Sequence, residues 1–172
     1  MTYLDLLGPS AMMRDLATQF PDFGRAGIEM TDAVFAMGDE VTRSELELVA
    51  SYASALNRCT YCKISHGAAA QAGGVDAVSV ESAESGSTPA HGGKKWEPVW
   101  DYVRMLTLSP ESSDQTYITA MKEKGWSEVT ILQFTLITGI YALYNRIANG
   151  LGFDASEAVL REAGKAIAAR NR

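Results

Sequence analysis

The chain has 172 residues, which suffice for one domain with a substantial hydrophobic core but hardly for two. Its composition is that of an ordinary globular protein, with 47% hydrophobic residues, 21% charged residues and a net charge of −6. No run of Lys or Arg occurs, so the basic surface needed to bind DNA, RNA or an anionic membrane is missing. We therefore expect no nucleic-acid partner and no membrane partner.

The N-terminal residues 1–20 do not resemble a secretory signal, because they contain acidic residues in place of a basic region and lack a continuous apolar segment. The most apolar stretch, ILQFTLITGIYALY, is too short to span a bilayer and contains Gln133 and Thr135. We expect a cytoplasmic protein. In that compartment its two cysteines would serve catalysis or metal binding rather than form a structural disulfide.

Helical periodicity dominates the first half of the chain. A helix is predicted over residues 23–37, and apolar residues recur at i, i+3 and i+4 over residues 42–58, which is typical of a half-buried helix. Thr42 followed by Glu45 predicts a capping box at the start of the second helix. A further helix is expected to begin near Cys59 and to end at the next Gly-Gly pair.

The segment ESAESGSTPAHGGKK, residues 81–95, is rich in Ser, Gly and Pro and is expected to be a surface loop. Helical patterns resume over four ranges, 96–108, 112–125, 127–150 and 154–170. The third of these helices is apolar nearly all round, which predicts burial on several sides, including a subunit contact.

No alternating run predicts a strand. We therefore expect an all-α helical bundle that forms a single domain over residues 1–172, with its core at about 20–153 and a C-terminal helix at about 154–170.

The segment NRCTYCKISH, residues 57–66, contains both cysteines and one of the two histidines. Residues three apart share a helix face, so the sulfurs of Cys59 and Cys62 can approach bonding distance if Cys59 lies at the helix start. The free N–H groups and the dipole at that end of a helix stabilise a thiolate, which is the reactive form. His66 lies one turn after Cys62 on the same face, where its imidazole can accept the thiol proton.

A carboxylate could complete this group. Glu47 lies on the preceding predicted helix, twelve residues before Cys59. Two helices joined by a short link can pack against each other, so the Glu47 carboxylate could reach the imidazole of His66 and orient it. The sequence therefore predicts that a dithiol, an imidazole and a carboxylate lie together.

The spacing E-x11-C-T-Y-C-x3-H, which starts at Glu47, resembles the signature of the alkylhydroperoxidase D-like (AhpD-like) group in the carboxymuconolactone decarboxylase superfamily. The segment SALNRCTYCKISH resembles the branch of peroxidase-related proteins in that group. The likeness extends over roughly residues 20–153 and includes YNRIANGLG near the end of the long apolar helix.

This resemblance implies an all-helical domain that assembles as a homotrimer or homohexamer. It also implies the reduction of a small hydroperoxide, or dithiol–disulfide exchange, with recycling by a reduced thiol protein or a small dithiol. By position, Cys62 would attack the peroxide, Cys59 would resolve the sulfenic acid, and Glu47 with His66 would form the proton relay. Tyr61 stands where some members have a second histidine, and tyrosine is a far weaker base at neutral pH.

Other interpretations of these residues stay open. A disulfide reductase and a non-catalytic oligomeric redox sensor would both use the dithiol, and a decarboxylase-type enzyme would use it only as an accessory. A zinc site could take Cys59, Cys62 and His66, with His91 or Glu47 as the fourth ligand, although the second C-x-x-C of a structural zinc site is absent. Two buried cysteines without chemistry and a solvated Glu47 are the simplest alternatives. No organic cofactor is implied, because no Gly-rich phosphate loop follows a strand.

Polar and aromatic residues outside this group receive simpler assignments. His91, beside two glycines, is expected to be exposed to solvent. Asn145 and Arg146 are expected to satisfy buried carbonyls or a subunit contact rather than to perform chemistry. Another set could line the mouth of a pocket, although aromatic residues at helical spacing usually belong to the core: Asn57, Tyr61, Trp96, Trp100 and Tyr102.

Overall fold

The computed structural model describes residues 2–169, and the predicted all-α fold is confirmed: these residues form nine α-helices and three short 3₁₀ helices, with no strand among them. The predicted end of the last helix at residue 170 lies outside the described residues. The α-helices are α1 Met13–Gln19, α2 Pro21–Phe35, α3 Arg43–Leu56, α4 Thr60–Ala72, α5 Ala77–Ser85, α6 Glu97–Leu108, α7 Gln115–Glu123, α8 Glu128–Leu151 and α9 Glu157–Ala169.

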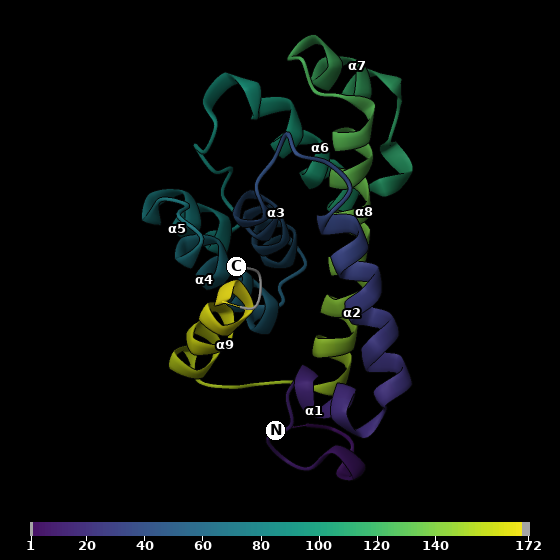
Figure 1. Cartoon of the computed structure of the whole chain (residues 1–172), viewed down its shortest axis with the longest axis vertical. Coiled ribbons are helices and arrows are strands. Elements are labelled where there is room, and N and C mark those ends of the chain that lie inside the picture. Colours follow the sequence, from purple (N-terminus) through teal and green to yellow (C-terminus); the bar gives the residue numbers. More distant parts are fainter. Residues whose placement is uncertain (1, 170–172) are drawn as a thin grey trace.

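The helix α3 occupies the middle of the bundle (Figure 1). It packs on α4 and α5 on one side and on α8 and α6 on the other, and α9 covers α4. The long helix α8 runs beside α2, and α1 lies at the end of the molecule opposite α7 (Figure 1). The site that the sequence predicts, on α3 and α4, therefore lies inside the bundle rather than at its edge.

Side-chain caps fix the ends of the helices that carry the predicted site and its neighbours. The predicted capping box of α3 is confirmed, because the Thr42 hydroxyl accepts from the Glu45 amide and the Glu45 carboxylate accepts from the Thr42 amide. Ser127 caps α8 by accepting from the Thr130 amide. These short-range signals place both helices along the chain.

Aromatic side chains fill the main core between α3, α6 and α8. Trp96 stacks on Trp100 with ring centroids 5.0 Å apart, and it meets Trp126 edge to face at 5.4 Å. Trp96, Trp100 and Tyr102 are 3%, 1% and 4% exposed, so these three belong to the core and not to a pocket mouth. The dithiol belongs to a second, smaller apolar cluster at the other end of the bundle.

The loop predicted over residues 81–95 is wrong in its first part, because α5 extends to Ser85. The Asp76 side chain accepts from the Ser79 amide and caps this helix, and Gly86 ends it in the left-handed conformation. Val80 and Ala83 are buried against the main core, so tertiary packing stabilises a helix whose composition is that of a loop.

Glycine allows α9 to approach α4 closely. A Cβ at Gly164 would come within 2.1 Å of the Ser65 carbonyl oxygen and within 2.7 Å of the Ala68 Cβ. Arg161 of α9 also forms a bidentate ion pair with Glu84 at 3.1 and 3.0 Å. The C-terminal helix is therefore a fixed part of the wall around α4.

The helix α8 is apolar on its buried side and on its exposed side. Phe134, Ile137 and Tyr141 are buried in the core, whereas Leu132 and Leu143 are 48% and 45% exposed. No helix among residues 2–169 is both long enough and apolar enough to cross a membrane. The subunit contact predicted for this helix stays a prediction.

Candidate functional site

A tight turn between α3 and α4 positions the first cysteine. Arg58 adopts the left-handed conformation, with φ of 56°, and is the one residue other than glycine with a positive φ among residues 2–169. The Cys59 amide donates to the Ser54 carbonyl at 2.9 Å and the Arg58 amide donates to the Ala55 carbonyl at 2.9 Å. These bonds form a Schellman motif that ends α3, so Cys59 directly follows the motif and becomes the N-cap residue of α4.

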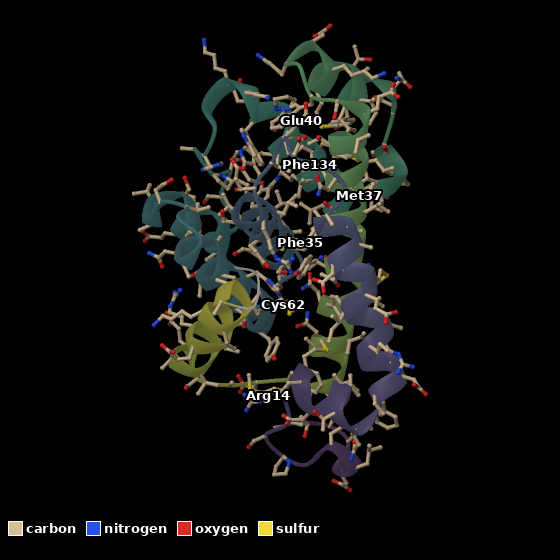
Figure 2. All side chains as sticks on the ribbon, in the orientation of Figure 1. Arg14, Phe35, Met37, Glu40, Cys62 and Phe134 are labelled. Atoms are coloured by element: carbon tan, nitrogen blue, oxygen red, sulfur yellow. The ribbon has the colours of Figure 1, made fainter. Side chains whose placement is uncertain are left out.

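Both thiols are free and buried. Cys59 is 0% exposed and Cys62, in the first turn of α4, is 2% exposed. Figure 2 shows Cys62 in the interior of the fold. The two sulfurs lie within hydrogen-bonding distance of each other, as their spacing predicts. The structure therefore represents a reduced dithiol that a reagent must enter the protein to reach.

The two thiols differ in acidity. The hydrogen bond with Cys62 lowers the pKa of Cys59, and although burial opposes this effect, the backbone amides of Cys62 and Tyr61 lower it further. The pKa of Cys62 is raised well above its usual value, because its proton is shared with Cys59 and its thiol is buried. The position of Cys59 at the N-terminus of α4 also favours its thiolate form. The first of the two thiols to ionise is therefore Cys59.

The structure brings Glu47 and His66 together. The Glu47 carboxylate lies 2.6 Å from Nδ1 of His66, and their side chains are 4% and 14% exposed. A buried carboxylate needs such a partner, so the alternative of a solvated Glu47 is wrong. The contact joins α3 to α4, and it leaves Nε2 of His66 free of the carboxylate.

Tyr141 of α8 adds a group that the sequence analysis missed. Its hydroxyl lies 3.3 Å from Nδ1 of His66, and the two rings pack edge to face with centroids 4.4 Å apart. Burial, together with the nearby charges of Glu47 and Cys62, raises the pKa of Tyr141 well above its usual value. Tyr141 therefore stays a neutral hydroxyl beside the imidazole of His66.

Asn145, one turn further along α8, joins three parts of the site. Its Nδ2 donates to the Ser54 hydroxyl at 2.9 Å, and its Oδ1 accepts from Asn57 Nδ2 at 2.9 Å. The side chain is 1% exposed, and its amide lowers the pKa of both thiols. Asn145 therefore binds side chains and not the buried carbonyls that the sequence predicts, while the alternative, a subunit contact of Asn145 and Arg146, stays a prediction. Arg146 is exposed and donates to a carbonyl of its own helix at 2.8 Å.

The spacing of Tyr141 and Asn145 is a signal that sequence reasoning could have used. Both are hydrogen-bonding residues in a mainly apolar helix, and they lie four positions apart, on one face of it. The sequence cannot show which neighbour that face meets. The structure directs it toward the turn between α3 and α4.

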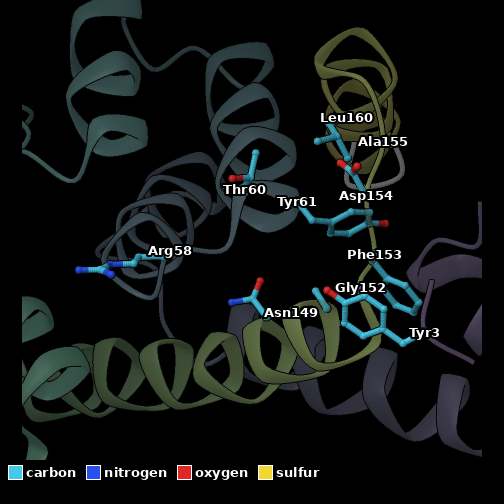
Figure 3. Close-up of a pocket in the computed structure, with 11 residues that line it drawn as sticks. Tyr3, Arg58, Thr60, Tyr61, Asn149, Gly152, Phe153, Asp154, Ala155 and Leu160 are labelled. Carbon is cyan, nitrogen blue, oxygen red and sulfur yellow. The ribbon is translucent and has the colours of Figure 1, made fainter. Parts of the chain in front are cut away.

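A cavity of about 470 Å³ lies beside the dithiol at the N-terminus of α4. Figure 3 shows the Tyr61 ring opposite the end of α8 and Phe153, while Arg58 lies on the other side of the opening. Asn57 does not line the cavity, although Tyr61 does, so one of these two predictions for the pocket mouth is correct. The lining residues are Tyr3, Arg58, Thr60, Tyr61, Ala148, Asn149, Gly152, Phe153, Asp154, Ala155 and Leu160.

The N-terminal segment covers the dithiol from another side. Ala11 packs in the same apolar cluster as Cys59 and Cys62, with Met13 at its edge. The Met13 amide donates to the Tyr61 hydroxyl at 3.2 Å. Tyr61 thus connects α1 to α4 and borders the cavity.

The prediction that His91 is exposed to solvent is wrong. Its Nε2 lies 2.9 Å from the Glu45 carboxylate, its side chain is 21% exposed, and its ring packs edge to face on Trp96 at 5.3 Å. Among residues 2–169 no three His, Cys, Asp or Glu side chains are grouped as metal ligands, so the predicted zinc set does not form there. His91 is half-buried and packs against Trp96 of the main core.

This geometry defines a class of protein: an all-helical domain with a buried dithiol beside a Glu–His pair. Residues 21–104 match the carboxymuconolactone decarboxylase family. No curated protein matches the chain.

Three solved structures share the fold. An uncharacterized peroxidase-related protein from Ralstonia eutropha JMP134, described as an alkylhydroperoxidase AhpD core, is 21% identical with a TM-score of 0.77, over 87% of this chain and 78% of that one. An uncharacterized peroxidase-related protein from Silicibacter sp. TM1040 is 19% identical with a TM-score of 0.68, over 90% and 92%. A protein of unknown function from Agrobacterium tumefaciens, suggested to be the antioxidant defence protein AhpD, is 16% identical with a TM-score of 0.73, over 91% and 99%. At these identities the matches establish an AhpD-like fold.

Proposed function

We propose that this protein is a thiol-dependent peroxidase that reduces small hydroperoxides through Cys59 and Cys62. The observation that carries the proposal is the Glu47–His66 contact at 2.6 Å, which lies one helical turn from a reduced, buried dithiol. A structural carboxylate–imidazole pair would not need two free thiols beside it. The names of the peroxidase-related structures with the same fold support the same activity.

In this reaction a thiolate attacks the outer oxygen of the hydroperoxide, and the O–O bond breaks to leave an alcohol and a sulfenic acid. His66, oriented by Glu47, supplies the proton that the leaving alkoxide needs. The second cysteine then attacks the sulfenic sulfur, which forms a disulfide and releases water. A reduced thiol protein or a small dithiol returns two electrons and two protons to the pair.

The roles of the two sulfurs can be reconciled with their acidity. The family resemblance assigns the attack on the peroxide to Cys62, whereas the resting charge is favoured on Cys59. Because the sulfurs share a hydrogen bond, a single proton shift from Cys62 to Cys59 creates the Cys62 thiolate without an outside base. Cys62 is also the cysteine one turn from His66.

Peroxide consumption in the presence of a reduced dithiol tests the proposal. Cys62→Ser is expected to abolish turnover, and Cys59→Ser is expected to stop it after one reaction per site, with the sulfenic acid trapped and detected by mass spectrometry. The matched control keeps both thiols and changes Asn149→Ala on the wall of the cavity. Wild-type activity in the Cys62→Ser protein would refute the mechanism.

A second candidate function is dithiol–disulfide exchange with a protein partner. The lowered pKa of Cys59, the first cysteine of the C-x-x-C and the N-cap of α4, favours it, because such a thiolate attacks disulfides readily. Parallel assays of peroxide consumption and of insulin disulfide reduction separate the two functions. A redox sensor without either activity would instead change its sedimentation on oxidation.

We also propose that the chain assembles as a homotrimer or homohexamer in the cytoplasm. An exposed apolar stripe on α8 supports assembly, because its members recur at three- and four-residue spacing. These members are Val129, Leu132, Leu136 and Leu143, each between 37% and 49% exposed. Sedimentation equilibrium of the wild-type protein and of Leu136→Glu tests this assembly. If both proteins are monomers, the apolar stripe on α8 is not a subunit interface.

A further inference from the structure

Among residues 2–169, no charged side chain other than the two thiols themselves is among the causes that shift the pKa of either thiol. The charged and titratable side chains of the neighbouring segments include Arg14, Asp15, Glu47, Arg58, Tyr61, His66 and Tyr141. The pKa values of the two thiols are shifted mainly by their mutual interaction, by burial, by backbone amides and by Asn145. A thiolate in this cluster therefore needs neutral hydrogen-bond donors, because burial alone disfavours the charged form.

The orientation of Asn145 is fixed by contacts that do not involve the thiols. Its Oδ1 accepts from Asn57 at 2.9 Å, so the nitrogen of the carboxamide points in the opposite direction. That nitrogen donates one N–H to the Ser54 hydroxyl at 2.9 Å. An amide group has two N–H donors, and the second remains available for another acceptor.

The same contacts hold the amide against the turn that carries the first cysteine. Ser54, which accepts from Asn145, also provides the carbonyl that accepts the Cys59 amide at 2.9 Å. Asn57, which binds the other end of the carboxamide, lies two residues before Cys59. Ala148, three residues after Asn145 on α8, packs in the cluster of Cys59 and Cys62. These contacts hold the remaining N–H of Asn145 close to the dithiol, and Asn145 lowers the pKa of both thiols.

We infer that Asn145 is a catalytic residue: its second N–H donates to whichever sulfur of the pair carries the negative charge. The inference rests on the proposed dithiol chemistry and adds a residue to it. A single donor shared by both sulfurs stabilises the thiolate on Cys59 at rest and on Cys62 after the proton shift. Moving the charge between the sulfurs then requires no rearrangement of the surrounding protein.

The test measures thiol ionisation directly. Alkylation by iodoacetamide is followed against pH in the full-length reduced protein, with mass spectrometry to distinguish Cys59 from Cys62. Asn145→Asp keeps the shape and the contact with Asn57 but replaces the donor by an acceptor, and Asn145→Ala removes the donor. In both variants we expect the alkylation profile of Cys59 to move up by about one pH unit, with roughly tenfold slower reaction at neutral pH.

Two controls separate this role from a structural one. Tyr144→Phe removes a hydroxyl that binds the Gly27 carbonyl, and Arg146→Lys changes an exposed side chain but keeps its charge; both positions are next to Asn145 on α8. Both are expected to keep the wild-type alkylation profile. If the Asn145 variants lose stability but leave the profile unchanged, Asn145 only fastens α8 to α3 and the inference is wrong.

A measurement on the wild-type protein covers the case in which the Asn145 variants do not fold. The side-chain ¹⁵N–¹H resonances of Asn145 are expected to shift in step with the first ionisation of the dithiol, and an absence of any shift would overturn the inference. Neither measurement uses a peroxide. A protein without peroxidase activity could thus still have an Asn145-stabilised thiolate, and a failure of this inference would leave the peroxidase proposal intact.

Discussion

Two Glu–His pairs start from α3, two residues apart, and they have different roles. Glu45 pairs with His91 at 2.9 Å, and Glu47 pairs with His66 at 2.6 Å. In the first pair the carboxylate also caps α3 and the imidazole packs on the Trp96 ring. In the second pair the imidazole contacts Tyr141 and lies one turn from Cys62. The same two residue types, Glu and His, thus stabilise the fold in one pair and lie near the dithiol in the other.

The comparison teaches that the surroundings of an imidazole decide its role. Each side chain of the Glu45–His91 pair is 21% exposed, whereas those of the Glu47–His66 pair are 4% and 14% exposed. Burial strengthens the electrostatic interaction between the second pair and any charge that forms beside it. The structural pair therefore offers an internal control for the pair in the site.

The largest expected effect is on turnover. Glu47→Gln and His66→Phe should each lower peroxide consumption about 100-fold, because general acid–base catalysis is lost. His91→Phe is the matched control and should keep the wild-type rate. Steady-state assays with a fixed dithiol reductant measure all three. Equal losses for His66→Phe and His91→Phe would mean that the two pairs do not differ in role.

A smaller effect is expected for Tyr141→Phe, which removes the hydroxyl beside His66 but keeps the ring. Loss of one buried hydrogen bond should slow turnover about three- to tenfold. Tyr144→Phe, on the next turn of α8, removes a hydroxyl that binds the Gly27 carbonyl at 3.0 Å and should leave the rate unchanged. An unaltered rate in Tyr141→Phe would restrict the site to the residues that the sequence predicts.

The Glu45–His91 pair should contribute to stability. Glu45→Ala removes the capping box and the contact with His91, so we expect unfolding to cost about 1 kcal/mol less, with no change in turnover. Glu45→Gln should recover most of this loss, because glutamine also completes a capping box. Urea denaturation measures the difference. A loss of peroxidase activity in either variant, at full folding, would contradict the separation of the two pairs.

The smallest expected effect is on the stability of the fold at acidic pH. Burial opposes ionisation of Glu45, but hydrogen bonds from His91 and Thr42 outweigh it and lower the pKa of the carboxyl below its ordinary 4.5. The ionised form is therefore favoured in the folded state, so its stabilisation is present above the unfolded pKa and is lost as pH falls through the folded pKa. The stability difference between wild type and Glu45→Gln should shrink between neutral pH and about pH 3. A difference that grows on acidification would reverse the assigned direction.

Much of the fold follows from local patterns in the sequence. The cap at Thr42, the cap at Ser127 and the 3.6-residue periodicity set helix positions through contacts within one or two turns. The prediction of a loop over residues 81–95 is wrong for residues 81–85, because their Ser-rich composition suggests a loop, whereas burial of Val80 and Ala83 stabilises a helix there. That burial depends on residues far away in the sequence.

The sequence by itself determined the all-helical fold and the candidate dithiol, because helix periods, caps and the C-x-x-C spacing are local properties of the chain. It also predicted that Glu47 could reach His66, since a short turn brings α3 against α4. Only the tertiary structure decided which face of α8 meets this turn. It thereby added Tyr141 and Asn145 and placed His91 with Glu45, because contacts between helices depend on how the whole core packs and not on the spacing within any one of them.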